Sequence, residues 1–461
     1  MAKSTITQLR DFPSVEELLQ NKKITPLIKQ LPRPVVAQII KDVIALSKQE
    51  FKLNKNITLS ALVNKIITIA INTKRKELTK VINATGIVVH TNLGRAPLSD
   101  ELFEEIRKTT VGFGNIEFDL QNGKRGKRGE AAEKYLSELS QAESSTIVNN
   151  CAAALFLILN SLANKKQVII SRSELVQIGG GFRIPDILKK SGAKLTEIGS
   201  TNITTIQDYE NAITDKTGMI LKVHQSNFVQ KGFVEQVSLK ELVTLGKKYS
   251  IPVVNDLGSG VFIPTKKILG YAEPTVQMSV RDSADITCFS GDKLLGGSQA
   301  GLIVGKESYI NKIKKNPLFR AMRADKISFA ILEKLLTYYL DNSWQDKIKL
   351  WNLLSVPESE LYKRGKKIQK NLGNIDGISV EATKGFVGGG ALPEADIPSV
   401  SIIFSNCYNP NKLIKQFRDL EYPIIGRIDN DRFILDLKAI EKSDISYVEQ
   451  SIKNILNNSL C

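Results

Sequence analysis

The sequence predicts an α/β fold with a mostly parallel sheet, preceded by a helical domain and followed by a small α+β domain. From about residue 80 onward, short apolar runs alternate with helical segments, which is the pattern of βαβ units. The first 75 residues show only the helical spacing of apolar residues. A strongly helical stretch, residues 327–372, precedes the last strand-like runs. We therefore expect three domains, at residues 1–75, 76–326 and 327–461.

The N-terminal segment is predicted to be a basic helical domain. Ser14 and Glu17 form a capping-box pattern, and residues 35–52 place apolar side chains on one helical face and lysines on the other. Residues 1–80 hold 15 Lys and Arg against 6 Asp and Glu, a net charge of +9 out of +16 for the chain. This charge fits both an ordinary basic surface and a nucleic-acid-binding domain, so charge alone does not separate the two.

Strand-like runs in the middle of the chain predict the sheet. They occupy residues 145–150, 167–172, 217–223, 251–257, 284–290 and 300–305, and helical segments separate several of them. The carboxyl ends of parallel strands meet at one edge of a sheet, where α/β proteins bind ligands. Further runs predict the strands of the α+β domain at residues 377–382, 399–404 and 432–437.

Composition and motifs argue against several classes of protein. The chain contains no apolar stretch of the about 18 residues that a membrane span needs, and the N-terminus lacks the apolar region of a signal peptide. We therefore expect a cytoplasmic protein. The 4 cysteines and 2 histidines have no spacing typical of zinc sites, so no metal site is expected. No GxGxxG motif follows the first strand, which weakens a dinucleotide-binding interpretation.

A predicted helix begins directly after the first strand of the sheet, at Asn150, Cys151 and Ala152. A helix N-terminus presents free N–H groups and the positive end of the helix dipole to an anion such as phosphate. These residues are therefore candidates for phosphate binding. Taken alone, a plain strand-to-helix turn explains them as well.

Two further strand ends carry ionisable residues. Asp256 is the first acid after one apolar run and is closely followed by Ser259, which we also count among the candidate cofactor-binding residues. Lys293 lies in the loop after the next run, three residues beyond Ser290. A carboxylate in this position either caps a helix or pairs with a buried cation such as a protonated pyridine nitrogen. The lysine is either a surface charge or a nucleophile. His224 ends another run at the same edge, where it contacts a ligand or makes a structural hydrogen bond.

In this chain order, a phosphate-binding helix start, a strand-end aspartate and a Ser-x-x-Lys segment are typical of pyridoxal-phosphate enzymes with the aminotransferase-like fold, fold type I. Lysine forms a Schiff base with the cofactor and moves the α-proton of the substrate, and aspartate keeps the pyridine nitrogen protonated. The competing interpretation is a dehydrogenase-type α/β domain. A serine hydroxyl at position 290 suits a phosphate oxygen.

Arginines gather in three further places. Guanidinium groups bind phosphate and other oxyanions through paired hydrogen bonds. Arg95 lies among turn-forming and apolar residues, which favours a binding role, and Arg320 and Arg323 form a second group. Arg125 and Arg128, in "NGKRGKRGE", fit a solvated basic face equally well.

Eight segments carry a resemblance to a known family. They include "VNNCAAAL" (148–155), "DLGSG" (256–260) and "SGDKLLGGSQAGLIVG" (290–305), and the others are residues 81–99, 171–188, 223–228, 320–326 and 423–437. These segments closely resemble those of bacterial selenocysteine synthases, the pyridoxal-phosphate-dependent L-seryl-tRNA(Sec) selenium transferases. The resemblance extends over essentially the whole chain. One departure is Cys151, where many relatives carry asparagine.

The resemblance implies roles for single residues. Lys293 matches the lysine that carries the cofactor, and Asp256 matches the partner of its ring nitrogen. Arg95, Arg320 and Arg323 match arginines that bind selenophosphate. The N-terminal domain resembles the one that binds serylated tRNA(Sec), in a ring-shaped decamer built from dimers.

The resemblance also implies a reaction: elimination of water from the seryl group to an aminoacrylyl intermediate, followed by addition of selenium. Two alternatives remain open on the sequence. One is a lyase of the same superfamily that acts on a small amino acid or sugar acid. The other is a nucleic-acid-binding protein without catalytic activity.

Overall fold

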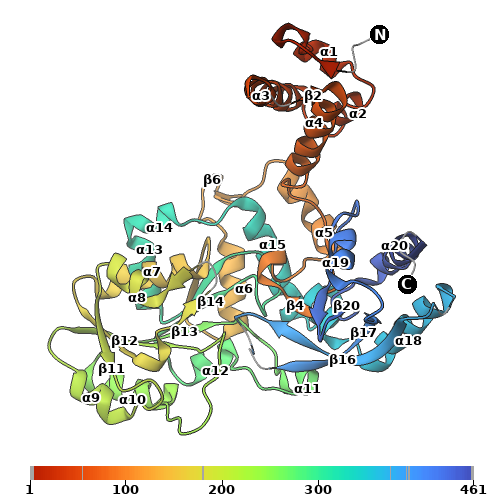
Figure 1. Ribbon diagram of the computed structural model, residues 1–461. Coiled ribbons are helices and arrows are strands. Elements are labelled where there is room, and N and C mark those ends of the chain that lie inside the picture. Colours follow the sequence, from red (N-terminus) through yellow and green to blue (C-terminus); the bar gives the residue numbers. More distant parts are fainter. Residues whose placement is uncertain are drawn as a thin grey trace. The chain divides into compact units, whose positions relative to one another are not determined.

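The computed structural model describes residues 5–53, 56–178, 181–373, 375–390, 392 and 395–457 (Figure 1). Residues 179 and 180, inside the segment 171–188 that carries part of the family resemblance, therefore lie outside the described residues. The chain divides into two units, Met1–Val81 and Ile82–Cys461. Each unit has its own apolar core.

The first unit is helical, as its periodicity predicts. The expected capping box is present, because the Ser14 hydroxyl accepts a hydrogen bond from the Glu17 N–H at 3.2 Å and the Glu17 carboxylate accepts one from the Ser14 N–H at 2.6 Å. Apolar side chains from all of its helices, Val36 and Ile66 among them, form one core. The elements are β1 (Thr5–Ile6), α1 (Val15–Leu19), α2 (Thr25–Ile28), α3 (Arg33–Lys52), β2 (Ile57–Thr58) and α4 (Leu59–Lys74).

A seven-stranded sheet forms the centre of the second unit, in the order β11-β8-β12-β13-β14-β15-β7. The first five strands in this order, β11, β8, β12, β13 and β14, run parallel to one another, whereas β15 is antiparallel to both of its neighbours. This arrangement confirms the mostly parallel sheet. The strands are β7 (Ser144–Val148), β8 (Gln167–Ser171), β11 (Lys194–Ile198), β12 (Thr217–Val223), β13 (Val253–Gly258), β14 (Ile286–Ser290) and β15 (Gly301–Gly305). Strand β11 was not expected from the sequence, because this edge strand is largely solvent-accessible and lacks an apolar run.

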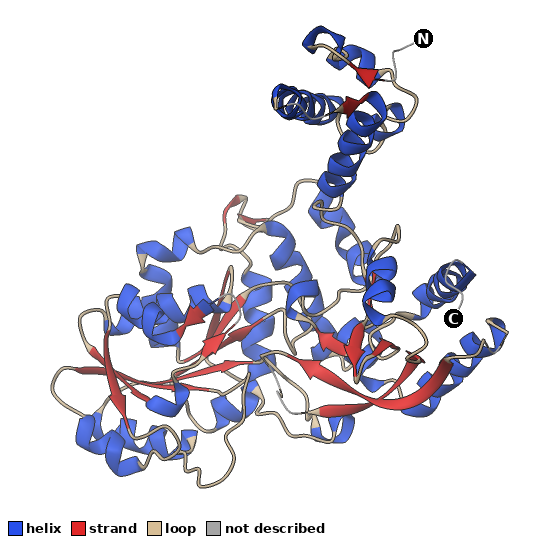
Figure 2. Ribbon diagram, in the orientation of Figure 1, coloured by secondary structure: helices blue, strands red, loops and turns tan. Residues whose placement is uncertain are grey.

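Helices cover both faces of this sheet (Figure 2). Side chains that alternate along a strand point to opposite faces, so Ile147 belongs to one core cluster and its neighbour Val148 to another. One face packs against α7 (Cys151–Ala163), α8 (Ile184–Lys190) and α13 (Glu307–Lys315). The other packs against α5 (Asp100–Val111), α6 (Glu130–Ser140), α12 (Val276–Arg281), α15 (Lys326–Leu340) and α17 (Lys349–Ser355), and, at its β11 end, α9 (Ile206–Ala212) and α10 (Leu239–Tyr249).

A second sheet joins the two ends of this unit. Its order is β19-β20-β17-β16-β4, and β4 (Ile87–Val89) pairs in parallel with β16 although it precedes the large sheet in the chain (Figure 1). The other strands are β16 (Ile378–Gly388), β17 (Asp396–Phe404), β19 (Arg427–Asp429) and β20 (Arg432–Asp436), and the helices packed on them are α18 (Glu358–Asn371), α19 (Pro410–Arg418) and α20 (Ile445–Asn457). This pairing holds the chain around residue 95 beside the end of β16.

No helix among the described residues combines the length and the apolar character that crossing a membrane requires.

Gly301 provides a test of how tightly β15 packs under the start of α7. A Cβ at this position would lie 2.1 Å from the carbonyl oxygen of Asn150. We expect Gly301→Ala to lower the free energy of unfolding by about 1–3 kcal/mol, because backbone has to shift to relieve the clash. The measurement is urea denaturation followed by circular dichroism.

The matched control is Gly112→Ala, where the nearest atom to the new Cβ, the Lys108 carbonyl oxygen, is 3.8 Å away. This control is expected to change the free energy of unfolding by less than about 0.5 kcal/mol. Equal effects of the two substitutions would contradict the packing argument.

Candidate active site

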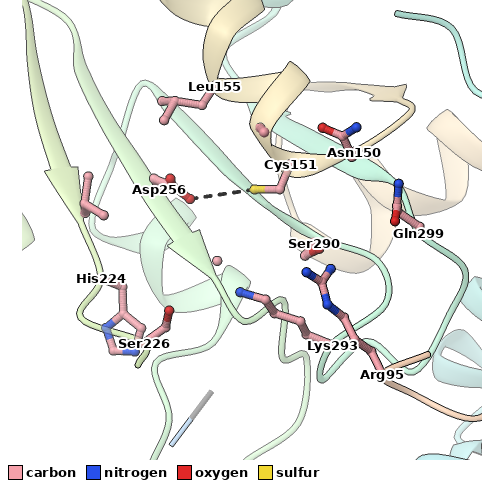
Figure 3. A pocket seen from close by; sticks show the side chains of 13 residues that line it. Arg95, Asn150, Cys151, Leu155, His224, Ser226, Asp256, Ser290, Lys293 and Gln299 are labelled. Carbon is pink, nitrogen blue, oxygen red and sulfur yellow. Dashed lines mark hydrogen bonds between the residues drawn. The ribbon is translucent and has the colours of Figure 1, made fainter. Parts of the chain in front are cut away.

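A cavity of about 290 Å³ opens at the carboxyl ends of the parallel strands (Figure 3). The loops after β12, β13 and β14 and the first turn of α7 surround it, which is the expected ligand position for an α/β sheet. Its lining consists of Arg95, Asn150, Cys151, Ala152, Leu155, Val223, His224, Ser226, Asp256, Gly258, Ser290, Lys293 and Gln299. The cavity thus brings together most of the candidates predicted from the sequence.

Lys293 reaches into this cavity from the turn after β14 (Figure 3). The residue is only 7% exposed, so it is not a solvated surface lysine. Gly390 leaves room for it, because a Cβ there would lie 2.6 Å from the Lys293 Nζ, whereas a Cβ at Gly258 would lie at an ordinary contact distance of 3.6 Å. Both glycines also have positive φ, of 69° and 88°, which disfavours other residues there. The glycine run that ends β16 therefore has a role that the sequence did not reveal.

Asp256 lies beside two thiols. It is the register partner of Cys288 on the neighbouring strand, and the Cys151 thiol donates a hydrogen bond to its Oδ1 at 3.8 Å (Figure 3). Burial raises the pKa of Asp256, while the charge of Lys293 and hydrogen bonds from the Cys151 and Cys288 thiols act in the opposite direction. A cation that enters the cavity beside Asp256 would therefore stabilise the ionised carboxylate, which its present partners compensate only in part.

The first turn of α7 faces the cavity. Asn150 is the N-cap, and its side-chain oxygen accepts a hydrogen bond from the Ala153 N–H at 2.8 Å. Cys151 and Ala152 are the first two helical residues, whose N–H groups have no partner within a helix. A helix start with free N–H groups thus lies at the place expected from the sequence.

Asp292, to which the sequence assigned no role, connects Arg95 with Ser290. Its carboxylate accepts a hydrogen bond from Arg95 Nη1 at 2.8 Å and another from the Ser290 hydroxyl at 2.7 Å. The Ala96 N–H also donates to the Asp292 carbonyl oxygen at 3.1 Å. Arg95 is therefore held in place with guanidinium donors left for an anion, whereas the Ser290 proton is already engaged.

His224 lies at the end of β12, where its N–H donates to the Asp256 carbonyl oxygen at 2.9 Å. The imidazole Nε2 lies 3.1 Å from Oε1 of the buried Glu273. A second buried carboxylate, Glu174, accepts hydrogen bonds from the Val223 N–H at 2.8 Å and from Lys222 Nζ at 3.1 Å. These contacts fix the position of the strand end that carries His224.

Three predicted site residues do not line the cavity. Ser259 is fully buried, and its hydroxyl lacks a hydrogen-bond partner among the described residues. Arg320 is exposed on α14 (Pro317–Ala321). Arg323 Nη1 lies 3.4 Å from a carboxylate oxygen of Glu117.

Glu117 also pairs with Arg125 at 2.6 Å and with Arg128 at 2.9 Å. Arg128 and Arg323 are largely covered, with about 25% and 30% of their side chains exposed, so they form part of an ion-pair cluster. The solvated-face interpretation of "NGKRGKRGE" fits Arg125, whose side chain is 70% exposed.

Several residues that line the cavity were not predicted from the sequence. Leu155, Val223 and Gln299 carry no chemical signal in the sequence, because apolar and amide side chains are common at such positions. Ser226 follows His224 by two residues, and the motif "VHQSN" drew attention to that stretch without identifying the serine.

Comparison with known proteins gives consistent results. Residues 81–441 match the family described as L-seryl-tRNA selenium transferase, and residues 9–46 match the selenocysteine synthase N-terminal family. The chain is 41% identical over 453 residues to the L-seryl-tRNA(Sec) selenium transferase of Aquifex aeolicus (strain VF5), covering 97% of this chain and 99% of that protein. It is also 41% identical over 459 residues to the enzyme of the same name from Alkaliphilus oremlandii (strain OhILAs), covering 96% of this chain and 98% of that protein.

Among solved structures, the chain resembles D-glucosaminate-6-phosphate ammonia-lyase, with a TM-score of 0.59 and 20% identity over 83% of this chain and 97% of that chain. At this identity the likeness concerns the fold alone. The aminotransferase-like α/β fold expected from the sequence is confirmed.

Asp256 provides a test of the electrostatics of the cavity. Because burial raises its pKa, the ionised carboxylate is unfavourable in the cofactor-free fold at neutral pH. We expect Asp256→Asn to raise the free energy of unfolding of the cofactor-free protein at pH 7.

A carboxyl whose folded pKa is raised destabilises the fold only where it ionises, so the advantage of Asp256→Asn should vanish as the pH falls below the pKa of the unfolded chain. Urea denaturation at several pH values measures this. A substitution that destabilises the protein at every pH would contradict the assignment.

Proposed function

Because this chain belongs to the L-seryl-tRNA selenium transferase family, we propose that it converts L-seryl-tRNA(Sec) to L-selenocysteinyl-tRNA(Sec), with pyridoxal phosphate as cofactor and selenophosphate as selenium donor. The observation that carries this proposal is a buried Lys293 in one cavity with a buried Asp256 and a helix N-terminus. The choice of substrate rests on family membership, and the choice of cofactor and reaction type rests also on the residues of the cavity.

The residues of the cavity fit the proposed cofactor. Lys293 would be the site of covalent attachment, and Asp256 would accept a hydrogen bond from the protonated ring nitrogen. The N–H groups of Cys151 and Ala152 would bind the phosphate, and Asn150 holds the helix start in place. His224 and Ser290 also line the cavity, whereas Ser259, the neighbour of Gly258 in the chain, is fully buried and does not line it. Bound pyridoxal phosphate withdraws electrons from the α-carbon of the seryl group.

Lys293 also moves the proton of the substrate. Its amine would take the α-proton of the seryl group, and the burial of Lys293 would limit competition from water. The absence of a Cβ at Gly390 gives the side chain room to move between these tasks.

Arg95 binds the anionic selenium donor. Asp292 holds its guanidinium at the mouth of the cavity, and the remaining donors face the oxyanion. Arg320 is exposed and Arg323 turns to Glu117, so we assign these two arginines to a site that a second copy of the chain completes.

Assembly from several copies also fits the exposed apolar side chains at the end of α5 and in the segment that leads from it to β5 (Phe118–Asp119). Val111 and Phe113 are 79% and 108% exposed, which is unusual for a surface that faces only water. We propose that the chain forms a homo-oligomer built from dimers, namely the decamer that the family resemblance implies.

The N-terminal unit binds the tRNA. It carries more than half of the net positive charge, and its sequence matches the selenocysteine synthase N-terminal family. A lyase acting on a small amino acid or sugar acid would have no use for this unit, which favours the tRNA substrate. With such a substrate, the enzyme works in the cytoplasm.

Replacement of Lys293 tests the catalytic assignment. We expect Lys293→Ala to lower the rate of selenocysteinyl-tRNA formation by at least about 10²–10⁴-fold, because the variant loses its general base. Borohydride reduction and mass spectrometry should find the cofactor on Lys293 in the unsubstituted protein.

Lys306→Ala is the matched control, since Lys306 pairs with Asp285 at the opposite end of β14 and is 43% exposed. This variant should keep full activity. Cofactor attached to another lysine after reduction would refute the assignment of Lys293.

Removal of the N-terminal unit, residues 1–81, tests the substrate. We expect the truncated chain to bind serylated tRNA(Sec) at least about tenfold more weakly and with a shallower dependence on salt, because phosphate contacts are lost. Filter binding at several salt concentrations measures both quantities. Retained cofactor absorption shows that the remaining unit is folded. Equal and weak binding by both chains would argue for a small-molecule substrate.

A further inference from the structure

We propose that Cys151, Cys288 and Asp256 form a binding site for a thiophilic divalent metal ion, Zn²⁺ above all, in the cofactor-free protein. The two sulfur atoms and a carboxylate oxygen all lie within 4.8 Å of one another. Two thiols and one carboxylate are a ligand set that zinc accepts and that magnesium and calcium do not favour. No spacing in the sequence indicates this site, because its ligands come from three distant segments.

The backbone holds the three ligands in position. Asp256 on β13 and Cys288 on β14 are register partners in neighbouring parallel strands, so their side chains lie on the same face of the sheet. Cys151 is the first residue of α7 and approaches this face from above. Gly301, on β15, packs against the carbonyl of Asn150 and so fixes the helix start against the sheet.

The spacing fits a metal ion without rearrangement of the fold. With metal–sulfur and metal–oxygen distances of about 2.3 and 2.0 Å, a tetrahedral ion separates its sulfur and oxygen ligands by about 3.5 Å. The Cys151 sulfur and Asp256 Oδ1 are already 3.8 Å apart. Small rotations of the side chains therefore suffice to close the site.

The metal has a route of entry and a free coordination position. Cys151 and Asp256 both line the cavity, whereas Cys288 is fully buried behind them. A water molecule from the cavity would provide the fourth ligand. Binding replaces the two thiol protons, and any proton on the Asp256 carboxyl group, by the metal ion and releases these protons to solvent, with no change in oxidation state.

The consequence is inhibition by competition. Asp256 cannot bind a metal ion and serve the ring nitrogen of the cofactor at the same time. This consequence rests on the proposed function, whereas metal binding itself does not.

The experiment uses cofactor-free protein of full length with all thiols kept reduced by a phosphine and counted by thiol titration. Co²⁺ is the spectroscopic probe, because thiolate ligands give it an intense near-ultraviolet absorption. We expect one Co²⁺ per chain with this absorption, and its loss when Zn²⁺ is added.

Variants show which ligands bind. Cys151→Ser and Cys288→Ala should each abolish the absorption. The double variant Cys407→Ser, Cys461→Ser should keep it, since Cys151 and Cys288 are the remaining cysteines of the sequence. Circular dichroism establishes that each variant is folded, and slower alkylation of Cys151 in the presence of Zn²⁺ tests the site without any substitution. Absence of the absorption in the unsubstituted protein, or its survival in Cys151→Ser and Cys288→Ala, would overturn the proposal.

Addition of pyridoxal phosphate separates this proposal from the proposed function. Displacement of Co²⁺ by the cofactor supports both. If Co²⁺ binds and the cofactor does not displace it, the result supports the metal site and contradicts the proposed competition between the metal ion and the cofactor. Cofactor binding by a protein that never binds Co²⁺ refutes the metal site and leaves the proposed function intact.

Discussion

The structure depends on keeping a carboxylate and an amine buried in one cavity. Asp256 and Lys293 are 8% and 7% exposed, and desolvation of such groups is costly unless partners compensate for it. The charge of Lys293 and the thiols of Cys151 and Cys288 compensate only part of the cost for Asp256, whose pKa stays raised. The fold therefore keeps a destabilising buried carboxylate, which is the group that we propose to pair with the cationic ring of the cofactor.

The rest of the second unit supports this arrangement. Apolar clusters on both faces hold β13 and β14 rigidly, so their ends present Asp256 and Lys293 at fixed positions. The second sheet then brings two distant segments to the same place. Pairing of β4 with β16 sets Gly390 against Lys293, and Arg95 reaches the cavity through its bond to Asp292.

Asp292 shows how one side chain serves two elements. It follows β14 directly, and its carboxylate links the serine at the strand end to the arginine after β4. An aspartate next to a lysine in a glycine-rich loop looks like an ordinary loop acid in the sequence. Its partners lie too far away in the chain for spacing to reveal them.

The sequence by itself determined the helix start at Cys151 and the positions of Asp256 and Lys293 near the ends of two strands, because alternation of apolar runs and helical segments is a local property of the chain. The alternation of strands and helices along the chain was also enough to predict the mostly parallel sheet. Only the tertiary structure decided that Gly390 and Asp292 belong to the cavity, that Arg323 pairs with Glu117, and that two cysteines flank Asp256. These outcomes depend on long-range packing between the two sheets and on strand register, which no local pattern of residues encodes.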